Sequence, residues 1–274
     1  MQMKNSLVYF TGTGNSLAVA RLLAAKLPGT EVHSVGRMLE GSHFDLDCGT
    51  CGFVFPVNCQ DAPEIMRRLV RRVHLPADAY VYAVATHNGD VGFSHFTLDR
   101  ILRKNGQRLR AGFAVLMPGN SIAPYNSTNS DEETQKRVLA AASEVAKIAD
   151  CVERQERQPF SGSASLRKRL KGFRNMLRHR VFNSVPENFW VTDACNHCGL
   201  CARICPENNI CVTADTVKWG KHCQICLACI HWCPQRAIQN GTETITRKRY
   251  HHPDITLEDM ICRSKDSCPK HSLS

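Results

Sequence analysis

Eight of the fifteen cysteines stand in two copies of one motif, C-x2-C-x2-C-x3-C-P. Residues 195–210 align with residues 223–238 at an offset of 28, and all four cysteines, the proline and the final isoleucine coincide. Three cysteines at this spacing wrap the chain around one face of a cubane cluster. The next turn carries the fourth cysteine away, to the other cluster of a pair. The repeat therefore predicts two [4Fe–4S] clusters.

The crossing of the fourth cysteine defines two ligand sets. The first cluster is expected to take Cys195, Cys198, Cys201 and Cys233, and the second Cys223, Cys226, Cys229 and Cys205. Pro206 and Pro234 lack an N–H group and fix the chain just past each fourth ligand. Zinc ribbons and disulfides are the alternatives, but zinc needs four ligands in two CxxC pairs, so a third evenly spaced cysteine is surplus.

The other cysteines carry less information. Cys211 follows the first half of the repeat and is expected in the core. Cys48 and Cys51 form a CxxC at the start of a predicted strand, whereas ligand sites in parallel sheets lie at the carboxyl ends, so we expect a structural role. Cys59 falls in a predicted ligand loop. No ligand pattern includes the remaining three, Cys151, Cys262 and Cys268.

A Gly-rich turn, Thr11-Gly12-Thr13-Gly14-Asn15-Ser16, lies between a predicted strand and a predicted helix. Its glycines let several N–H groups point at one phosphate, and the helix dipole and three hydroxyls favour the same anion. No lysine follows, which argues against a nucleotide-triphosphate loop, and the third glycine of a dinucleotide fingerprint is absent.

Strand and helix patterns alternate over the first half of the chain. Strand patterns cover residues 7–10, 32–35, 53–55, 80–85 and 111–117, and helical patterns cover residues 16–27, 65–73, 93–102 and 132–152. Buried strands that alternate with helices imply a mostly parallel sheet covered on both faces, which is an α/β fold.

A phosphate loop without a cation resembles the FMN-phosphate loop of flavodoxins. The resemblance implies a flavodoxin-like, five-stranded parallel sheet of order 2-1-3-4-5 over residues 1–155, with FMN at its carboxyl edge. The loops at that edge are rich in Gly, Pro, Asn or Asp, as ligand loops commonly are. The implied flavin contacts are Thr11, Gly12, Thr13, Gly14, Asn15, Ser16, Pro56, Asn58, Thr86, Asn88, Gly89, Gly119, Asn120 and Tyr125. The loop 58–61 lacks the aromatic residues that similar proteins often carry after the third strand, so stacking on the flavin is expected either to involve Tyr125 or Phe93 or to be weak.

The cysteine repeat is similar to bacterial two-cluster [4Fe–4S] ferredoxins, which are small α+β domains. As a whole, the chain resembles the flavodoxin–ferredoxin fusion proteins of anaerobic bacteria, the EFR1 family, and residues 249–253 look like that family's ending. The expected organisation is a flavodoxin-like domain at 1–155, a basic helical connector at 156–188, a ferredoxin domain at 189–240 and a C-terminal tail at 241–274. Within the connector, a helix at 166–181 has a basic face that is expected either to be solvated or to dock an acidic redox partner.

The charge and hydropathy of the chain limit the partners and the compartment that we expect. The formal charge of +10 falls to about +6 with two clusters, and to about +4 with a bound flavin phosphate. Such a chain gives no reason to expect nucleic acid as a partner. No apolar run is long enough to span a bilayer and no signal peptide is recognisable, so we expect a cytoplasmic protein.

Three functions fit these features. An electron carrier would relay electrons between FMN and the clusters, with redox proteins as partners. A flavin-dependent reductase would need an acid or base beside the flavin, for which His87 and Tyr125 are candidates by position alone. A flavin-free redox sensor is the third, although no DNA-binding motif supports it. We favour the carrier.

Overall fold

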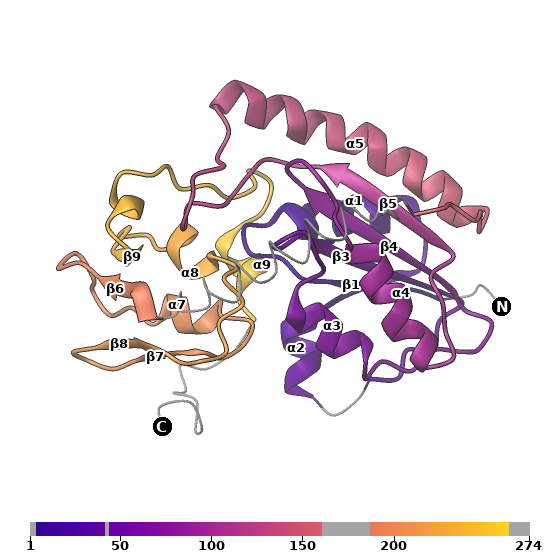
Figure 1. Cartoon of the computed structure of the whole chain (residues 1–274), viewed down its shortest axis with the longest axis horizontal. Coiled ribbons are helices and arrows are strands. Elements are labelled where there is room, and N and C mark those ends of the chain that lie inside the picture. Colours follow the sequence, from indigo (N-terminus) through magenta and orange to yellow (C-terminus); the bar gives the residue numbers. More distant parts are fainter. Residues whose placement is uncertain (1–3, 42–43, 161–186, 263–274) are drawn as a thin grey trace. The chain divides into compact units, whose positions relative to one another are not determined.

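The structure is a computed structural model, and it describes residues 4–41, 44–160 and 187–262. These residues form two compact units (Figure 1). The first contains described residues 4–11, 15–118 and 129–160, and the second contains residues 12–14, 119–128 and 187–262. The part of the connector expected to form a helix at 166–181 lies outside the described residues.

The first unit is built on a five-stranded parallel sheet. Its strands are β1 (Asn5–Tyr9), β2 (Thr30–Ser34), β3 (Thr50–Pro56), β4 (Tyr80–His87) and β5 (Ala111–Leu116). They pair in the order β2-β1-β3-β4-β5, and every pair is parallel. This order confirms the predicted flavodoxin-like fold and brings the carboxyl ends of β1, β3, β4 and β5 to one edge.

Helices cover both faces of this sheet (Figure 1). On one face lie α1 (Asn15–Lys26) and α5 (Asp131–Glu153), and on the other lie α2 (Val35–Glu40), α3 (Glu64–Val70) and α4 (Ser94–Lys104). Alternate strand residues such as Leu7, Val54 and Tyr82 pack with α1 and α5 in one core cluster. The burial of both faces explains why β1, β3 and β4 read as nearly continuous apolar runs, whereas the edge strand β2 is exposed to half-buried and more polar. The short helix α2 was not predicted.

The second unit is small and mixed. Its elements are β6 (Phe189–Val191), α7 (Leu200–Arg203), β7 (Ile210–Val212), β8 (Val217–Trp219), α8 (Ala228–His231), β9 (Ile238–Asn240), the 3-10 helix η2 (Glu243–Ile245) and α9 (Leu257–Met260). β6 pairs with β9 and β7 with β8, both antiparallel. Ile210 and Ile238, the final isoleucines of the two halves of the cysteine repeat, are both buried in its core.

The second unit also takes in two segments that are distant in sequence. Ile122 and Ala123, from the loop after β5, lie in the same apolar cluster as Ile230 and Leu227.

None of the helices in the described ranges is long and apolar enough to cross a membrane.

Candidate cluster and flavin sites

The two halves of the cysteine repeat have matching backbones as well as matching residues. Three positions in each half have positive φ, between 50° and 74°, and they recur at the same offset of 28. The pairs are His197 and Ile225, Gly199 and Leu227, and Asn208 and Arg236. Glycine adopts positive φ values with little strain, whereas residues such as Ile225 and Leu227 do so at a cost in energy. Their positive φ values therefore indicate that the local fold requires this backbone conformation. Both halves therefore share two sharp turns between successive cysteines and one after the fourth cysteine.

One cavity of the second unit is lined by Cys195, Cys198, Cys201 and Cys233. With its mouth, it contains about 390 Å³ of space outside the protein atoms. Cys229 also reaches its wall. Three of the four predicted ligands come from the first half of the repeat and the fourth comes from the second half.

The other cavity is lined by Cys205, Cys223, Cys226 and Cys229, and measures about 360 Å³ in the same way. Here the arrangement is reversed, because Cys205 from the first half lies among three cysteines of the second half. The linings of the two cavities match the expected ligand sets apart from Cys229, which reaches both cavities, and the ligation itself stays a prediction.

Without a metal, the buried thiols of these cysteines are difficult to ionise. Burial raises the pKa of Cys201 to about 12 and that of Cys223 to about 11. It also raises the pKa values of Cys226 and Cys229, and neighbouring thiols add to the effect. Iron supplies the positive charge that would ionise such thiols, so the donor set fits a cluster.

Backbone N–H groups also point at the sulfur atoms. The N–H of Asn209 donates to Cys205 Sγ and that of Ile225 to Cys223 Sγ, each at 3.3 Å. Hydrogen bonds of this kind stabilise thiolates and tune cluster potentials. In the described ranges, no group of three or more His, Cys, Asp or Glu side chains converges as a single metal ion would require. The cysteines instead surround the two cavities.

The expected phosphate loop lies where β1 ends and α1 begins. Gly14 has a φ of 94°, which favours glycine strongly. The Gly12 carbonyl accepts a hydrogen bond from Trp232 Nε1 at 3.1 Å, and the Thr13 carbonyl accepts one from the His252 N–H at 2.8 Å. In a trans peptide the N–H points opposite to the C=O, so the N–H groups of Thr13 and Gly14 face away from these partners. This orientation fits an anion-binding turn.

The hydroxyl groups near this loop have protein partners. Ser16 Oγ lies 2.8 Å from Thr86 Oγ1, and both residues are buried. Asn120 Nδ2 donates to Thr13 Oγ1 at 2.8 Å, and Asn15 Nδ2 donates to the Pro118 carbonyl at 3.0 Å. Either hydroxyl can be the donor of the Ser16–Thr86 bond, so Ser16 can donate to a phosphate only in the arrangement in which it accepts from Thr86.

The loop after β3 is a tight turn. Asn58 and Asp61 exchange two backbone hydrogen bonds of 2.9 Å, and Cys59 and Gln60 between them have φ values of 52° and 63°. Two central residues with positive φ define a type I′ turn. The Phe93 N–H donates to the Gln60 carbonyl at 2.7 Å, which connects the loops after β3 and β4.

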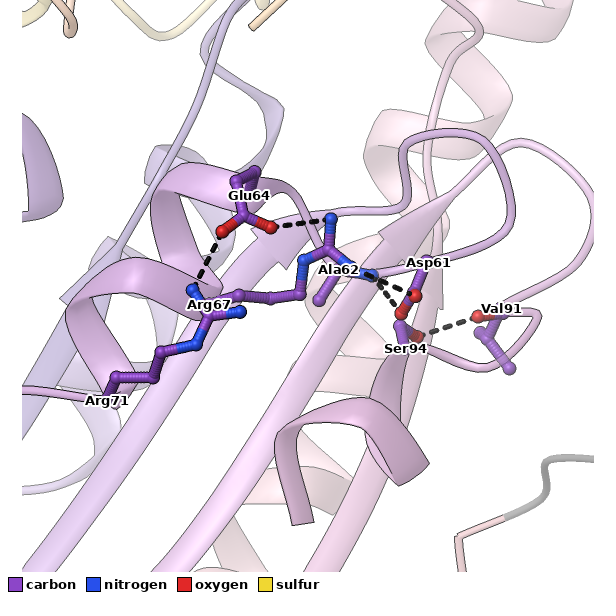
Figure 2. A network of polar contacts seen from close by, with 7 residues as sticks. All are labelled: Asp61, Ala62, Glu64, Arg67, Arg71, Val91 and Ser94. Carbon is purple, nitrogen blue, oxygen red and sulfur yellow. Dashed lines mark hydrogen bonds and ion pairs between the residues drawn. The ribbon is translucent and has the colours of Figure 1, made fainter. Parts of the chain in front are cut away.

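A charge network fixes the base of the same loop, as Figure 2 shows. Arg67 lies 2.8 Å from the Glu64 carboxylate and 3.5 Å from that of Asp61, and Arg71 reaches Glu64 at 2.7 Å. Beside it, Ser94 Oγ donates to the Val91 carbonyl at 2.7 Å. These contacts tie both loops to the first turns of α3 and α4, so the loops are positioned by helices.

The other expected flavin contacts are less enclosed. Asn88 and Gly89 are exposed, and Tyr125 is 58% exposed. Pro56 and Asn58 are half-buried, whereas Gly119 is buried. Of the two aromatic residues expected to stack on the flavin, Tyr125 is exposed and Phe93 is half-buried, so neither is fully packed.

Two polar side chains, His87 and Arg137, lie near the carboxyl end of β4. Burial lowers the pKa of His87, whose Nδ1 accepts the Gly89 N–H at 3.1 Å, so the neutral ring carries its proton on Nε2. Arg137 from α5 contacts the Asn88 side-chain oxygen and the Met117 carbonyl, and pairs with Glu133 at 2.6 Å. Arg137 was not expected at this edge because it lies far along the chain, on a helix with no motif.

No family model and no curated protein matches this chain. Solved structures that resemble it include the rubredoxin oxygen:oxidoreductase of Desulfovibrio gigas, at 14% identity and a TM-score of 0.33 over 55% of this chain. The match spans 37% of that protein. An azoreductase of Bacillus anthracis (13% identity, TM-score 0.37) and an archaeal flavodoxin (14%, 0.30) match 54% and 53% of this chain and 99% of their own lengths. At these values the likenesses identify no family, and the flavodoxin-like fold of the first unit rests on its strand order.

Proposed function

We propose that this chain is an electron-transfer protein that holds two [4Fe–4S] clusters and an FMN. The observation that carries the proposal is the grouping of the cysteines. Each of two cavities is lined by three cysteines of one half of the repeat and the fourth cysteine of the other half, and Cys229 reaches the wall of both. Two separate zinc sites would not need this exchange, whereas a pair of cubanes uses it.

The role of the chain toward the clusters is to bind them and to limit access of water. In this proposal Cys195, Cys198, Cys201 and Cys233 hold one cluster, and Cys223, Cys226, Cys229 and Cys205 hold the other. The apolar wall of the first cavity includes Ile204, Val212 and Ile238, and such a wall lowers the local dielectric and shifts the potential. Redox proteins are the expected partners.

The role of the chain toward the flavin is carried by the turn Thr11–Ser16. The backbone of Thr13 and Gly14 would donate to the phosphate, at the start of α1 where the dipole favours an anion. Bound FMN would exchange one or two electrons, whereas each cluster takes one. The combination would convert between two-electron and one-electron transfer.

The proposal is tested by anaerobic reconstitution of the full chain with iron, sulfide and FMN. We expect about eight irons and eight sulfides per chain and one FMN with quenched fluorescence. Cys151→Ala is the matched control, because Cys151 lies on α5 in the first unit and should leave the iron content unchanged. Four irons or fewer, or stoichiometric zinc, would contradict the clusters.

A kinetic measurement tests the relay separately. When the clusters are reduced chemically, the flavin absorbance should bleach at a rate independent of protein concentration. A rate proportional to concentration would mean that electrons pass only between molecules, and the relay would fail even if both cofactors bind.

A further inference from the structure

A pair of cysteines in the first unit is separate from the repeat. Cys51 lies in β3, and Cys48 lies three residues before it, at the end of the sheet opposite the expected flavin edge. Cys51 pairs in register with Ser6 of β1, and residues directly opposite one another in a sheet point to the same face. The Cys48 thiol is hydrogen-bonded to both the Cys51 thiol and the Ser6 hydroxyl. The two sulfur atoms are therefore in contact.

The two thiols differ in electrostatic character. Hydrogen bonds from Cys51 and Ser6 outweigh burial and lower the pKa of Cys48 to about 7, although Asp47 and Glu31 oppose the effect. The hydrogen bond to Cys48, together with burial, raises the pKa of Cys51. A CxxC with an acidic first thiol and a protonated second one has the polarity of a dithiol that reacts through its first cysteine.

We propose that Cys48 and Cys51 form a redox-active dithiol, which a low-molecular-weight disulfide oxidises reversibly to an intramolecular disulfide. The Cys48 thiolate attacks one sulfur of the oxidant, the oxidant's S–S bond breaks, and one thiol leaves with a proton. The Cys51 thiol then loses its proton and attacks Cys48 Sγ, which expels the second thiol. The dithiol loses two electrons and two protons, and the oxidant gains both as two thiols.

Access to the pair is through Cys48. It is 3% exposed, whereas Cys51 is fully buried. Cys48 ends an irregular segment held by the bonds of Leu46 N–H to the His74 carbonyl and of Gly49 N–H to the Lys4 carbonyl. The Phe44 and Gly49 carbonyls also accept bonds from the His74 and Tyr80 N–H groups, but the segment lies outside the regular strands and should therefore open more readily than they do. The attack on Cys48 is therefore slow and limited by this opening.

The dithiol is independent of the proposed cofactors. Five residue steps of about 3.3 Å lie between Cys51 and the end of β3 at Pro56, so about 17 Å separates Cys51 from the carboxyl edge of the sheet. A failure of the dithiol would leave the cluster and flavin assignments untouched, and a chain without FMN or iron would still show the dithiol chemistry.

The test equilibrates the full-length protein anaerobically in buffers of increasing oxidised-to-reduced glutathione ratio. After acid quenching and alkylation, trypsin releases residues 38–67 as one peptide that contains Cys48, Cys51 and the exposed Cys59. We expect this peptide to lose two hydrogens through a 48–51 disulfide at high ratio and to regain them when the ratio is reversed. Alkylation of both Cys48 and Cys51 at every ratio would overturn the proposal.

Variants separate the roles of the two thiols. In Cys51→Ala, Cys48 should accumulate as a mixed disulfide with glutathione, because the resolving thiol is absent. In Cys48→Ala, Cys51 should stay alkylatable after denaturation at every ratio, because it is buried. Cys151→Ala should retain the wild-type 48–51 disulfide, with circular dichroism confirming that each variant is folded. A folded Cys51→Ala protein whose Cys48 never gains glutathione would overturn attack through Cys48.

Discussion

Gly12 is the position where the smallest substitution should have the largest effect on the second unit. A Cβ at this residue would lie 2.2 Å from the carbonyl oxygen of Cys226, whereas ordinary contact begins at 3.4 Å. Gly12→Ala must therefore open a gap of about 1.2 Å (3.4 − 2.2) against backbone, which yields less easily than the end of a flexible side chain. Cys226 is one of the four cysteines around the second cavity.

The expected cost follows from this geometry. Insertion of one methyl group into a packed site typically costs about 1–3 kcal/mol, and a clash with backbone belongs in the middle of that range or above it. A loss of about 2 kcal/mol raises the population of opened second units roughly 30-fold. The assay is the rate of iron release to a chelator from the reconstituted protein in mild urea. This rate should rise by the same factor if release requires that opening.

Gly89→Ala is the matched control. A Cβ at Gly89 meets nothing within 4 Å and the residue has no positive φ, so the substitution should leave the rate nearly unchanged. A Gly12→Ala protein that releases iron within twofold of the wild-type rate would refute the contact between Gly12 and Cys226.

Three further outcomes are expected. Cys205→Ala should lower the iron content from about eight to about four per chain by removing the cluster of Cys223, and a Mössbauer spectrum that assigns the loss to the Cys195 cluster would refute the crossing. Gly14→Val forces a side chain into a φ of 94° and within 3.0 Å of Ile255 Cβ, so FMN binding, followed by fluorescence quenching, should be lost. Burial lowers the pKa of His95 to about 4, so the neutral form stabilises the fold above pH 6.5 and this stability declines as the pH falls toward 4. His95→Phe should remove about 2 kcal/mol of the stability loss between pH 7 and pH 5, measured by urea unfolding, and an unchanged loss would contradict this burial effect.

The features that sequence alone predicted are local ones. The strands β1, β3 and β4 were visible because burial on both faces leaves a nearly uninterrupted apolar run, and the turn at Gly14 was visible because only glycine suits that conformation. The fixed spacing of the cysteine repeat led to the two groups that line the cavities. The helix α2 was missed because six residues with an internal Gly36 give too short a pattern.

The features that sequence could not predict depend on contacts between distant residues. Trp232 and His252 hold the carbonyls of Gly12 and Thr13, yet neither belongs to a motif that includes them. The positive φ of Leu227 is equally hidden, because leucine gives no sign of a left-handed conformation and only its alignment with Gly199 suggests one.

The hydrogen bond from Trp232 to Gly12 spans 220 residues of chain, which has a consequence for biosynthesis. The first strand and its turn leave the ribosome long before the partners of that turn are translated. Contacts of such high sequence separation form late, because the loop between them must be closed first. The carbonyls of Gly12 and Thr13 therefore acquire their final partners only after residue 252 has been made. A nascent or truncated chain that ends before residue 232 lacks both partners, so the finished state of this turn requires the chain up to residue 252.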